Sequence, residues 1–141
     1  MAVEMISSSI RNASGTTLRR FEGFKAGLAA HQVGVAAVLE AEHYDHACGL
    51  RALMRYWEST PRDQRIEALF CENDILAIGA IDALVLSNAQ NKIAIVGFDD
   101  IELANAPSYQ LTTFRQPIEH LVSEAIRRIV EPDAGTRDSL M

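Results

Sequence analysis

The sequence predicts an α/β fold, a three-layer sandwich built around a mostly parallel sheet. Short apolar runs alternate with amphipathic stretches of about 10 to 15 residues, which is the order of elements in βαβ units. Residues 93–96 are apolar at every position, as expected for a strand that helices cover on both faces. With 141 residues, of which 48% are hydrophobic, the chain is long enough for one domain with its own core.

The first half of the chain supplies two strands and two helices. Residues 3–6 and 35–39 are apolar runs of strand length. A polar loop ends at Gly15, after which Thr16 or Thr17 can cap a helix. The apolar positions that follow at helical spacing are Leu18, Phe21, Phe24 and Leu28. Asp45 is an N-cap candidate for a second helix that reaches about residue 58, and its inner face carries Leu50, Leu53, Met54 and Trp57.

The second half repeats the alternation. A proline-containing break at residues 61–64 is followed by a strand at 66–71, and Asp74 opens a helix that extends to about residue 87. Strands are predicted at residues 93–96 and 111–114. Pro117 suits the first position of a final helix that runs through residue 130.

Charge and composition exclude several classes of protein. The formal net charge of −6 repels the DNA backbone, so a regulatory protein with this chain needs a separate DNA-reading part. No apolar stretch is long enough for a membrane span, and residues 1–10 lack the basic start of a signal peptide, so we expect a cytoplasmic protein. Cys48 and Cys71 show neither zinc-site nor disulfide spacing and are expected to be buried and reduced.

Polar residues follow two neighbouring predicted strands. Asn73 and Asp74 come after one, and Asp99 and Asp100 come after the next. In parallel sheets ligands bind outside the carboxyl ends of the strands, so these residues are candidates for one binding rim. One of Asn73 and Asp74 is expected to cap the following helix, which leaves the other to face the cleft. The Asp99-Asp100 pair is equally consistent with a simple turn.

Three further features have competing interpretations. Arg20 is expected on the first turn of the first helix, next to its positive end, where it either reaches for an oxygen-rich group or is a solvated surface charge. Tyr44 is either a stacking surface for a sugar or a core residue. The pair His43 and His46, with Glu42 and Cys48 close by, is a weak metal pattern, and no metal or cofactor is predicted.

Known enzyme signatures are absent from the sequence. It contains no G-x-S-x-G, P-loop or Rossmann glycine pattern. Asp74 with Asp99 could hold magnesium for phosphoryl chemistry, but no lysine or nucleophile motif accompanies them. We therefore expect a binding protein and not an enzyme.

Four pieces of sequence, in order, resemble the lactose/galactose repressor family. Residues 20–24 (RFEGF) are similar to its R-x-x-G-F motif, and residues 68–80 (ALFCENDILAIGA) to its strand, N-D turn and A-x-G helix. Residues 93–100 (IAIVGFDD) and 111–117 (LTTFRQP) are similar to its V-G-F-D-D and L-T-T-x-x-Q-P signatures. The match covers nearly the whole chain, from about residue 10 to about residue 130.

The resemblance implies half of a periplasmic-binding-protein-like (type I) fold. Residues 1–141 would be the C-terminal part of an effector-binding domain, without the DNA-binding domain and most of the N-terminal subdomain. It also implies a sugar-like effector, a homodimer formed through this subdomain, and operator DNA contacted only by the missing N-terminal part. The alternative function is a sugar-binding protein of a transport system with the same fold, which the missing signal peptide and the paired signatures argue against.

The same resemblance supplies candidate contacts for the effector. Its motif positions correspond here to Arg20, Asn73, Asp99 and Gln116, with Tyr44 as a stacking aromatic and Thr16 as a weaker candidate. In this scheme Asp99 accepts two sugar hydroxyls and Asp100 is structural.

Overall fold

A computed structural model describes residues 3–8, 15–90 and 92–131, with side chains from residue 19 onward. Five strands form one sheet in the order β2-β1-β3-β4-β5, and every neighbouring pair is parallel. The strands are β1 (Val3–Ser8), β2 (Val35–Ala41), β3 (Ala68–Cys71), β4 (Ala94–Phe98) and β5 (Thr112–Phe114). This arrangement confirms the predicted parallel α/β sheet.

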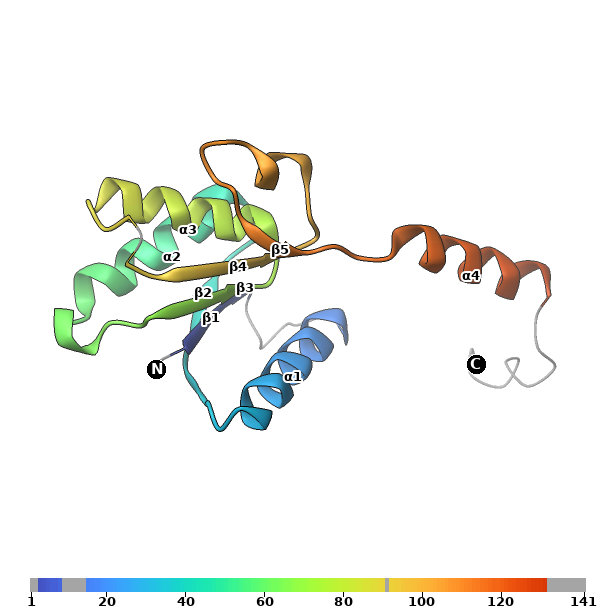
Figure 1. The fold of residues 1–141 in the computed structure, drawn as a ribbon, viewed down its shortest axis with the longest axis horizontal. Coiled ribbons are helices and arrows are strands. Elements are labelled where there is room, and N and C mark those ends of the chain that lie inside the picture. Colours follow the sequence, from blue (N-terminus) through green and yellow to red (C-terminus); the bar gives the residue numbers. More distant parts are fainter. Residues whose placement is uncertain (1–2, 9–14, 91, 132–141) are drawn as a thin grey trace.

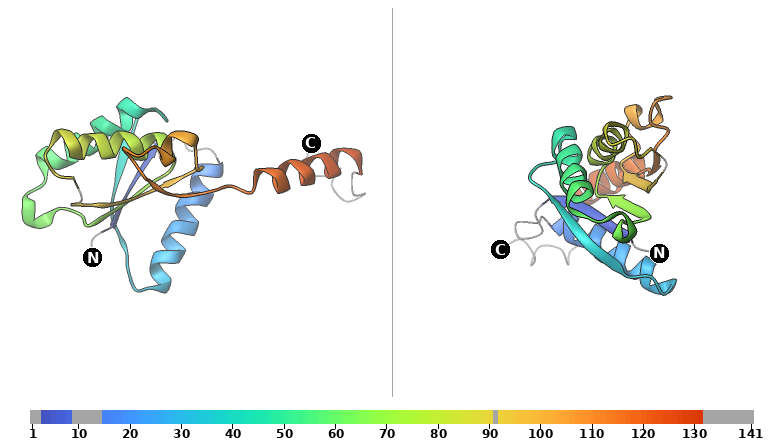
Figure 2. Two further views of the ribbon diagram at one scale, coloured as in Figure 1. Left: turned by 45° about the horizontal axis from the view of Figure 1, so that its top comes forward. Right: turned by 90° about the vertical axis from the view of Figure 1, so that its left-hand side faces the viewer.

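Four α-helices accompany the sheet in the described residues: α1 (Gly15–Ala30), α2 (His46–Ser59), α3 (Asp74–Leu86) and α4 (Ile118–Val130). Helices α2 and α3 cover one face of the sheet and α1 lies on the other (Figure 1). The three layers are also separate in the turned views of Figure 2. Helix α4 extends away from these layers at the end of the segment that follows β5 (Figure 1). None of the helices in the described residues is long and apolar enough to cross a membrane.

The core lies between the sheet and the helices α2 and α3. Its largest fully buried side chains include Leu53 of α2, Leu69 of β3, and Leu76 and Ile78 of α3. The two helices approach closely because each has glycine at the contact. A Cβ atom on Gly49 would collide with the carbonyl oxygen of Leu76, and one on Gly79 with the carbonyl oxygen of His46. Glycine is therefore required at both positions for this spacing of the helices.

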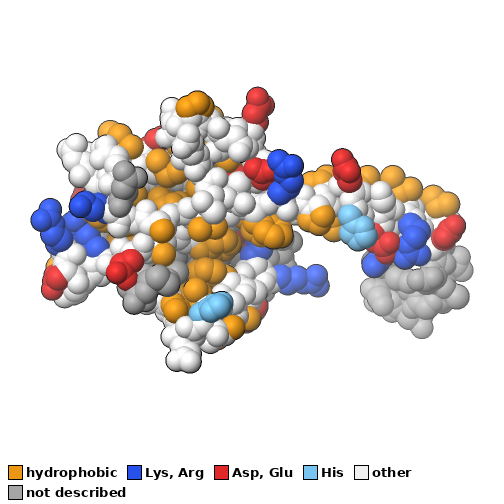
Figure 3. All heavy atoms as spheres, viewed as in Figure 1, with side chains coloured by type: hydrophobic (Ala, Val, Ile, Leu, Met, Phe, Trp, Pro, Cys, Tyr) orange, Lys and Arg blue, Asp and Glu red, His pale blue; other side chains and the backbone are white. Residues whose placement is uncertain are grey.

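The opposite face is more thinly covered. Phe24 of α1 stacks on Phe70 of β3 with ring centroids 4.6 Å apart, yet Phe21, Phe24 and Leu28 remain only partly buried. Helix α4 buries none of its residues. Figure 3 shows the hydrophobic side chains that line this helix on the visible side of the molecule.

Most predicted elements are present, and their ends differ by a few residues. Helix α1 begins at Gly15, so Thr16 and Thr17 lie in its first turn and neither stands before it as a cap. The loop expected at residues 12–14 lies outside the described residues. Asp45 caps α2 as predicted, since its Oδ1 accepts a hydrogen bond from the Cys48 amide at 2.7 Å.

The cap of α3 is Asn73 and not Asp74. Asn73 has extended backbone, and its Oδ1 accepts a hydrogen bond from the Leu76 amide at 2.9 Å. Asp74 is the first residue of the helix and is fully buried. The expectation that the second of these two residues would face the cleft is therefore wrong for Asp74.

Both cysteines are free and buried, as predicted. Burial raises the pKa of the Cys71 thiol, and the nearby Asp74 carboxylate raises it further. Cys71 therefore stays protonated, which makes it a poor nucleophile.

Candidate functional site

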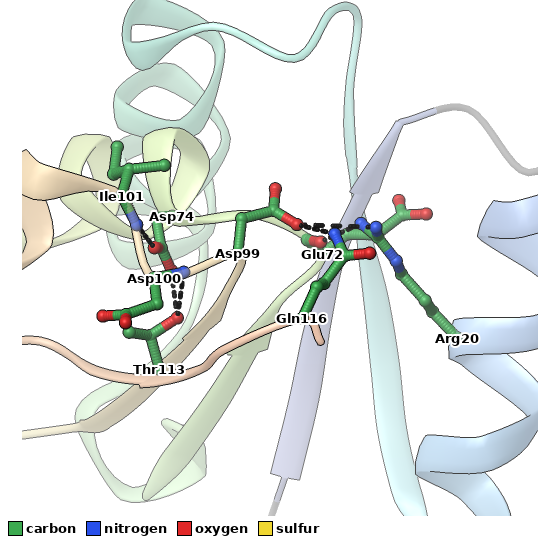
Figure 4. A network of polar contacts seen from close by, with 8 residues as sticks. All are labelled: Arg20, Glu72, Asp74, Asp99, Asp100, Ile101, Thr113 and Gln116. Atoms are coloured by element: carbon green, nitrogen blue, oxygen red, sulfur yellow. Dashed lines mark hydrogen bonds and ion pairs between the residues drawn. The ribbon is translucent and has the colours of Figure 1, made fainter. Parts of the chain in front are cut away.

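The candidate site lies where the carboxyl ends of β3, β4 and β5 meet. The parallel register pairs Phe98 at the end of β4 with Phe114 at the end of β5. The residues that follow the strands are therefore brought together at the carboxyl ends of the sheet, among them Glu72, Asp99 and Gln116 (Figure 4). Arg20 reaches the same edge from α1. These side chains form a polar rim, as expected for ligand sites in parallel sheets.

Asp99 is the centre of this rim. Its Oδ1 accepts a hydrogen bond from Gln116 Nε2 at 2.5 Å and lies 3.5 Å from Arg20 Nη2. Its Oδ2 accepts no hydrogen bond from any residue that the structure describes, and in Figure 4 it points away from both partners. The carboxylate is 31% exposed. One oxygen is thus held by the protein while the other faces outward.

Arg20 is fixed in position by three separate contacts. Besides the ion pair with Asp99, its Nη1 donates to the carbonyl oxygen of Glu72 at 2.9 Å. Its guanidinium also lies over the Phe98 ring, 4.2 Å from the centroid. These contacts leave only 19% of the side chain exposed, so Arg20 is not a freely solvated surface charge. Because α1 starts at Gly15, Arg20 lies in the second turn of that helix and not in its first.

The backbone at the end of β4 is strained. Asp99 has a φ of 115° and Asp100 a φ of 53°, conformations that side-chain-bearing residues seldom adopt. The Asp99 amide still donates to the carbonyl oxygen of Phe114 at 2.9 Å, which anchors the turn to β5. Strain of this kind concentrates at functional sites, where the surrounding contacts hold it in place.

Asp74 is buried beneath the rim and holds the backbone that carries it. Its Oδ1 accepts a hydrogen bond from the Thr113 hydroxyl at 2.5 Å, and its Oδ2 accepts one from the Ile101 amide at 2.9 Å. One buried carboxylate therefore ties α3 to the turn after β4 and to β5 (Figure 4). Both ends of the turn are held, at the Asp99 amide by Phe114 and at the Ile101 amide by Asp74. The Asp99 side chain therefore projects from a fixed backbone.

Asp100 is turned away from the rim and serves the turn itself. It accepts hydrogen bonds from Arg115 Nε and from Asn105 Nδ2, the latter at 3.3 Å. The hydrogen bond from Arg115 holds the pKa of this carboxyl below its usual value, and that from Asn105 acts in the same direction. Such contacts fit the structural role inferred for Asp100.

Two other predicted site residues, Asn73 and Tyr44, take no part in the rim contacts given above. Asn73 uses its side-chain oxygen for the cap of α3, and its amide nitrogen donates to no described residue. Tyr44 is 45% exposed in the bend after β2, and β1 separates that strand from β3. The side chain of Thr16 lies outside the described part of the structure. These three residues remain predicted contacts.

The sequence did not single out three of the contributing groups. The carbonyl oxygen of Glu72 receives Arg20, the ring of Phe98 supports it, and the hydroxyl of Thr113 fixes Asp74. A main-chain oxygen leaves no signature in a sequence. Phe98 and Thr113 do stand inside the quoted motifs, where they resembled ordinary strand residues.

No metal centre is formed by the described residues, among which no three His, Cys, Asp or Glu side chains are placed to share an ion. His46 of the weak metal pattern instead contacts Asp82 of α3, with Nε2 2.7 Å from Oδ2. Tyr109 donates to the same Asp82 oxygen at 3.4 Å. The contacts link the start of α2 to α3.

Known proteins resemble this chain in sequence and in fold. A family model described as a periplasmic binding protein-like domain matches residues 3–137. The ribose operon repressor of Escherichia coli K12 is 33% identical over 119 residues, which are 80% of this chain and 36% of the repressor. The ribose operon repressor of Halalkalibacterium halodurans is 33% identical over 127 residues, 86% of this chain and 37% of that protein. The chain thus spans little more than a third of these curated relatives.

Solved structures agree. A putative LacI-family regulator from Sanguibacter keddieii superimposes with a TM-score of 0.79 and 25% identity, over 92% of this chain and 48% of that one. A lac repressor dimer bound to operator and an anti-inducer also gives 0.79, with 22% identity over 92% of this chain and 44% of the repressor chain, which shows the shared fold. The chain therefore belongs to the periplasmic binding protein-like domain family, in the form found in LacI-type transcription regulators.

Proposed function

We propose that this chain is the effector-binding and dimerisation part of a transcription regulator, and that the effector is a small sugar-like molecule. The observation that carries the proposal is the state of Asp99. Gln116 and Arg20 hold its Oδ1, while Oδ2 faces outward from the rim. A carboxylate oxygen fixed in this way can accept hydrogen bonds from two hydroxyl groups, and hydrogen bonds to a charged acceptor are stronger than neutral ones.

Apolar surface beside Asp99 suits the rest of a sugar. The Phe114 ring stacks on Phe98 with centroids 5.1 Å apart and remains more than half exposed. A sugar presents hydroxyl groups around its edge and C–H groups on its faces, so a polar centre next to an aromatic plane matches both parts. Thr16, Tyr44 and Asn73 are proposed as further contacts to the same molecule.

Binding, and not catalysis, is the proposed activity. A magnesium-dependent reaction on Asp74 and Asp99 would need both carboxylates to face one cavity. Asp74 is fully buried, and both of its oxygens accept hydrogen bonds within the fold. The aspartates therefore do not form an open pair of metal ligands.

A regulator is favoured over a transport protein because the curated relatives reported above are operon repressors. The charge of −6 argues against direct binding to DNA by this chain. We propose that operator DNA is contacted by a separate N-terminal domain, in the cytoplasm, where such a regulator acts.

The proposed dimer uses the surface around α3. Leu84, Val85 and Leu86 stand in succession, and the structure buries Leu84 while Val85 and Leu86 stay exposed. A groove of about 330 Å³ beside them is lined in part by Ile81, Val85 and Tyr109. Sedimentation at high micromolar concentration should give the mass of a dimer, and Val85→Glu with Leu86→Glu should give a monomer that retains its fold.

Effector binding is tested by calorimetry with a panel of monosaccharides and sugar acids on the full regulator. Asp99→Asn and Arg20→Ala should each weaken binding by about ten- to a hundredfold, since each removes one charged hydrogen-bond partner worth roughly 1.5–3 kcal/mol. Affinity for operator DNA should change little. Asp63→Asn, an exposed position in the short helix Arg62–Gln64, is the matched control. If both rim variants bind the effector normally, the assignment of this site is wrong.

A further inference from the structure

A cavity lies at the amino ends of β3 and β4, at the opposite end of the strands from the Asp99 rim. It has a volume of about 390 Å³. The end of α2 contributes Trp57, the segment before β3 contributes Arg62, Arg65 and Glu67, and the loop between α3 and β4 contributes Asn88 and Lys92. Backbone pairing joins the two sides, because the Ala94 amide donates to the carbonyl oxygen of Glu67 at 2.9 Å.

The charge of this cavity is opposite to that of the protein. Arg62, Arg65 and Lys92 stand against the single carboxylate of Glu67, which leaves a formal charge of +2 from three cations and one anion. The whole chain carries −6. A concentration of positive charge inside a concave surface attracts anions and raises their local concentration.

Arg65 is the structural member of the three cations. Its Nε donates to the carbonyl oxygen of Thr60 at 3.1 Å, and its Nη2 donates to that of Trp57 at 2.9 Å. Its guanidinium also lies 3.9 Å from the centroid of the Trp57 ring. Arg65 therefore neutralises the carboxyl end of α2 and forms one wall of the cavity together with Trp57.

Arg62 and Lys92 are not used in this way. Both are exposed, and neither side chain makes a hydrogen bond or ion pair with any described residue. The carboxyl end of α3 does not need them, because three of its last carbonyl oxygens accept hydrogen bonds from the turn that follows. The Asn88 amide donates to Val85 O at 3.1 Å and the Ala89 amide to Leu84 O at 2.8 Å. Two cations are thus left facing the cavity with all their donors available.

We propose that this cavity is a second binding site, separate from the Asp99 rim, for a small molecule that carries a phosphate group. The volume falls within the range of about 300–1,000 Å³ that is usual for small-molecule pockets. A guanidinium can donate two parallel hydrogen bonds to phosphate oxygens, and an ammonium adds a mobile point charge. Arg62 and Lys92 supply one of each.

The test is a thermal melt of the full chain with inorganic phosphate at constant ionic strength. A ligand that binds only the folded state raises the melting temperature, so phosphate should stabilise the protein relative to chloride. Arg62→Gln with Lys92→Gln should reduce phosphate affinity, measured by calorimetry, at least tenfold. Lys25→Gln with Arg128→Gln removes the same charge from α1 and α4 and should leave the affinity unchanged, as should Asp99→Asn.

Three results would overturn the proposal. One is the absence of any effect of phosphate on the unmodified chain. The second is an equal loss of affinity in both double variants, which would show a general response to net charge. The third is saturable binding of a glutamate-rich peptide without binding of phosphate, which would make the cavity part of a protein-binding surface.

Discussion

The two faces of the sheet differ sharply in how they are covered. On the face packed by α2 and α3, Leu53, Leu76 and Ile78 lose all or nearly all contact with solvent. On the other face α1 buries its aromatic residues only in part. Helix α4, which extends away from both faces, buries none of its residues. The extent of burial is not explained by how amphipathic each helix is. Helix α3 is apolar nearly all round, whereas α4 carries a regular apolar stripe that stays exposed: Ile118, Leu121, Val122, Ile126, Ile129 and Val130.

This comparison shows that an apolar stripe on a helix predicts that some surface covers it, but not which surface. A helix that is apolar on every side must be buried, so the environment of α3 is determined by its own composition. An amphipathic helix needs one covered face, and several surfaces can provide it. In the described residues nothing covers the stripe of α4, where Ile129 is 78% exposed.

The largest expected effect is in the α2/α3 layer. Leu76→Ala removes a fully buried side chain and should lower the free energy of unfolding by about 3 kcal/mol, within the range seen for such cavities. Phe24→Ala on the opposite face should have a clearly smaller effect, although it removes a larger side chain. Urea denaturation of both variants measures the contrast. Equal losses would show that the two faces are equally well packed.

Asp74→Ala tests the link between the α2/α3 layer and the rim. It leaves the Ile101 amide and the Thr113 hydroxyl without their acceptor, which should lower the free energy of unfolding by about 1–3 kcal/mol. The turn that carries Asp99 should also become less ordered. Thr113→Val removes one of the two contacts and should have about half the effect. A stability loss no larger for Asp74→Ala than for Thr113→Val would contradict the shared role of this carboxylate.

The exposed stripe of α4 should contribute little to the stability of the chain. Ile126→Ser with Ile129→Ser should change the free energy of unfolding by no more than about 0.5 kcal/mol, as is usual for exposed positions. Amide protons of α4 should exchange much faster than those of α3, because a short helix without tertiary contacts is marginal in water. Slow exchange in α4, together with a loss of stability in the double variant, would mean that another part of the protein covers the stripe.

Acid should affect α4 through Glu124, and this is the smallest effect that we expect. Hydrogen bonds from Arg127 and Arg128 lower the pKa of this carboxyl from 4.5 to about 2. Because the pKa of Glu124 is lower in the folded helix than in the unfolded chain, its ionised form stabilises the helix at any pH above about 4.5. That contribution is lost as the pH falls from about 4.5 to about 2. Protection of the α4 amides, corrected for the intrinsic pH dependence of exchange, should therefore fall across this window. Glu124→Gln should exchange faster at neutral pH and lose the acid dependence, and an unchanged profile would contradict the assignment.

Several elements were predictable because they depend on local chemistry. Asp45 precedes an amphipathic run and caps α2, and the apolar run at 93–96 overlaps the strand β4. The choice between Asn73 and Asp74 was not predictable in this way. Both residue types suit an N-cap, and the outcome depends on Thr113 and the Ile101 amide, 39 and 27 residues further along the chain, which engage Asp74.

The sequence by itself determined the alternation of strands and helices, the parallel sheet, and the presence of Arg20, Asp99 and Gln116 among the candidate binding residues. The elements follow from periodicity and capping, which act over a few residues, and Asp99 was a candidate from its place after a strand. Gln116 was a candidate only through the resemblance to the repressor family. Only the tertiary structure decided which groups pair with one another and which surfaces are buried. It brings Arg20 to the carbonyl oxygen of Glu72, buries Asp74 and leaves α4 exposed. The physical reason is that a hydrogen bond or a buried surface belongs to two partners, and here the partners are distant in the chain.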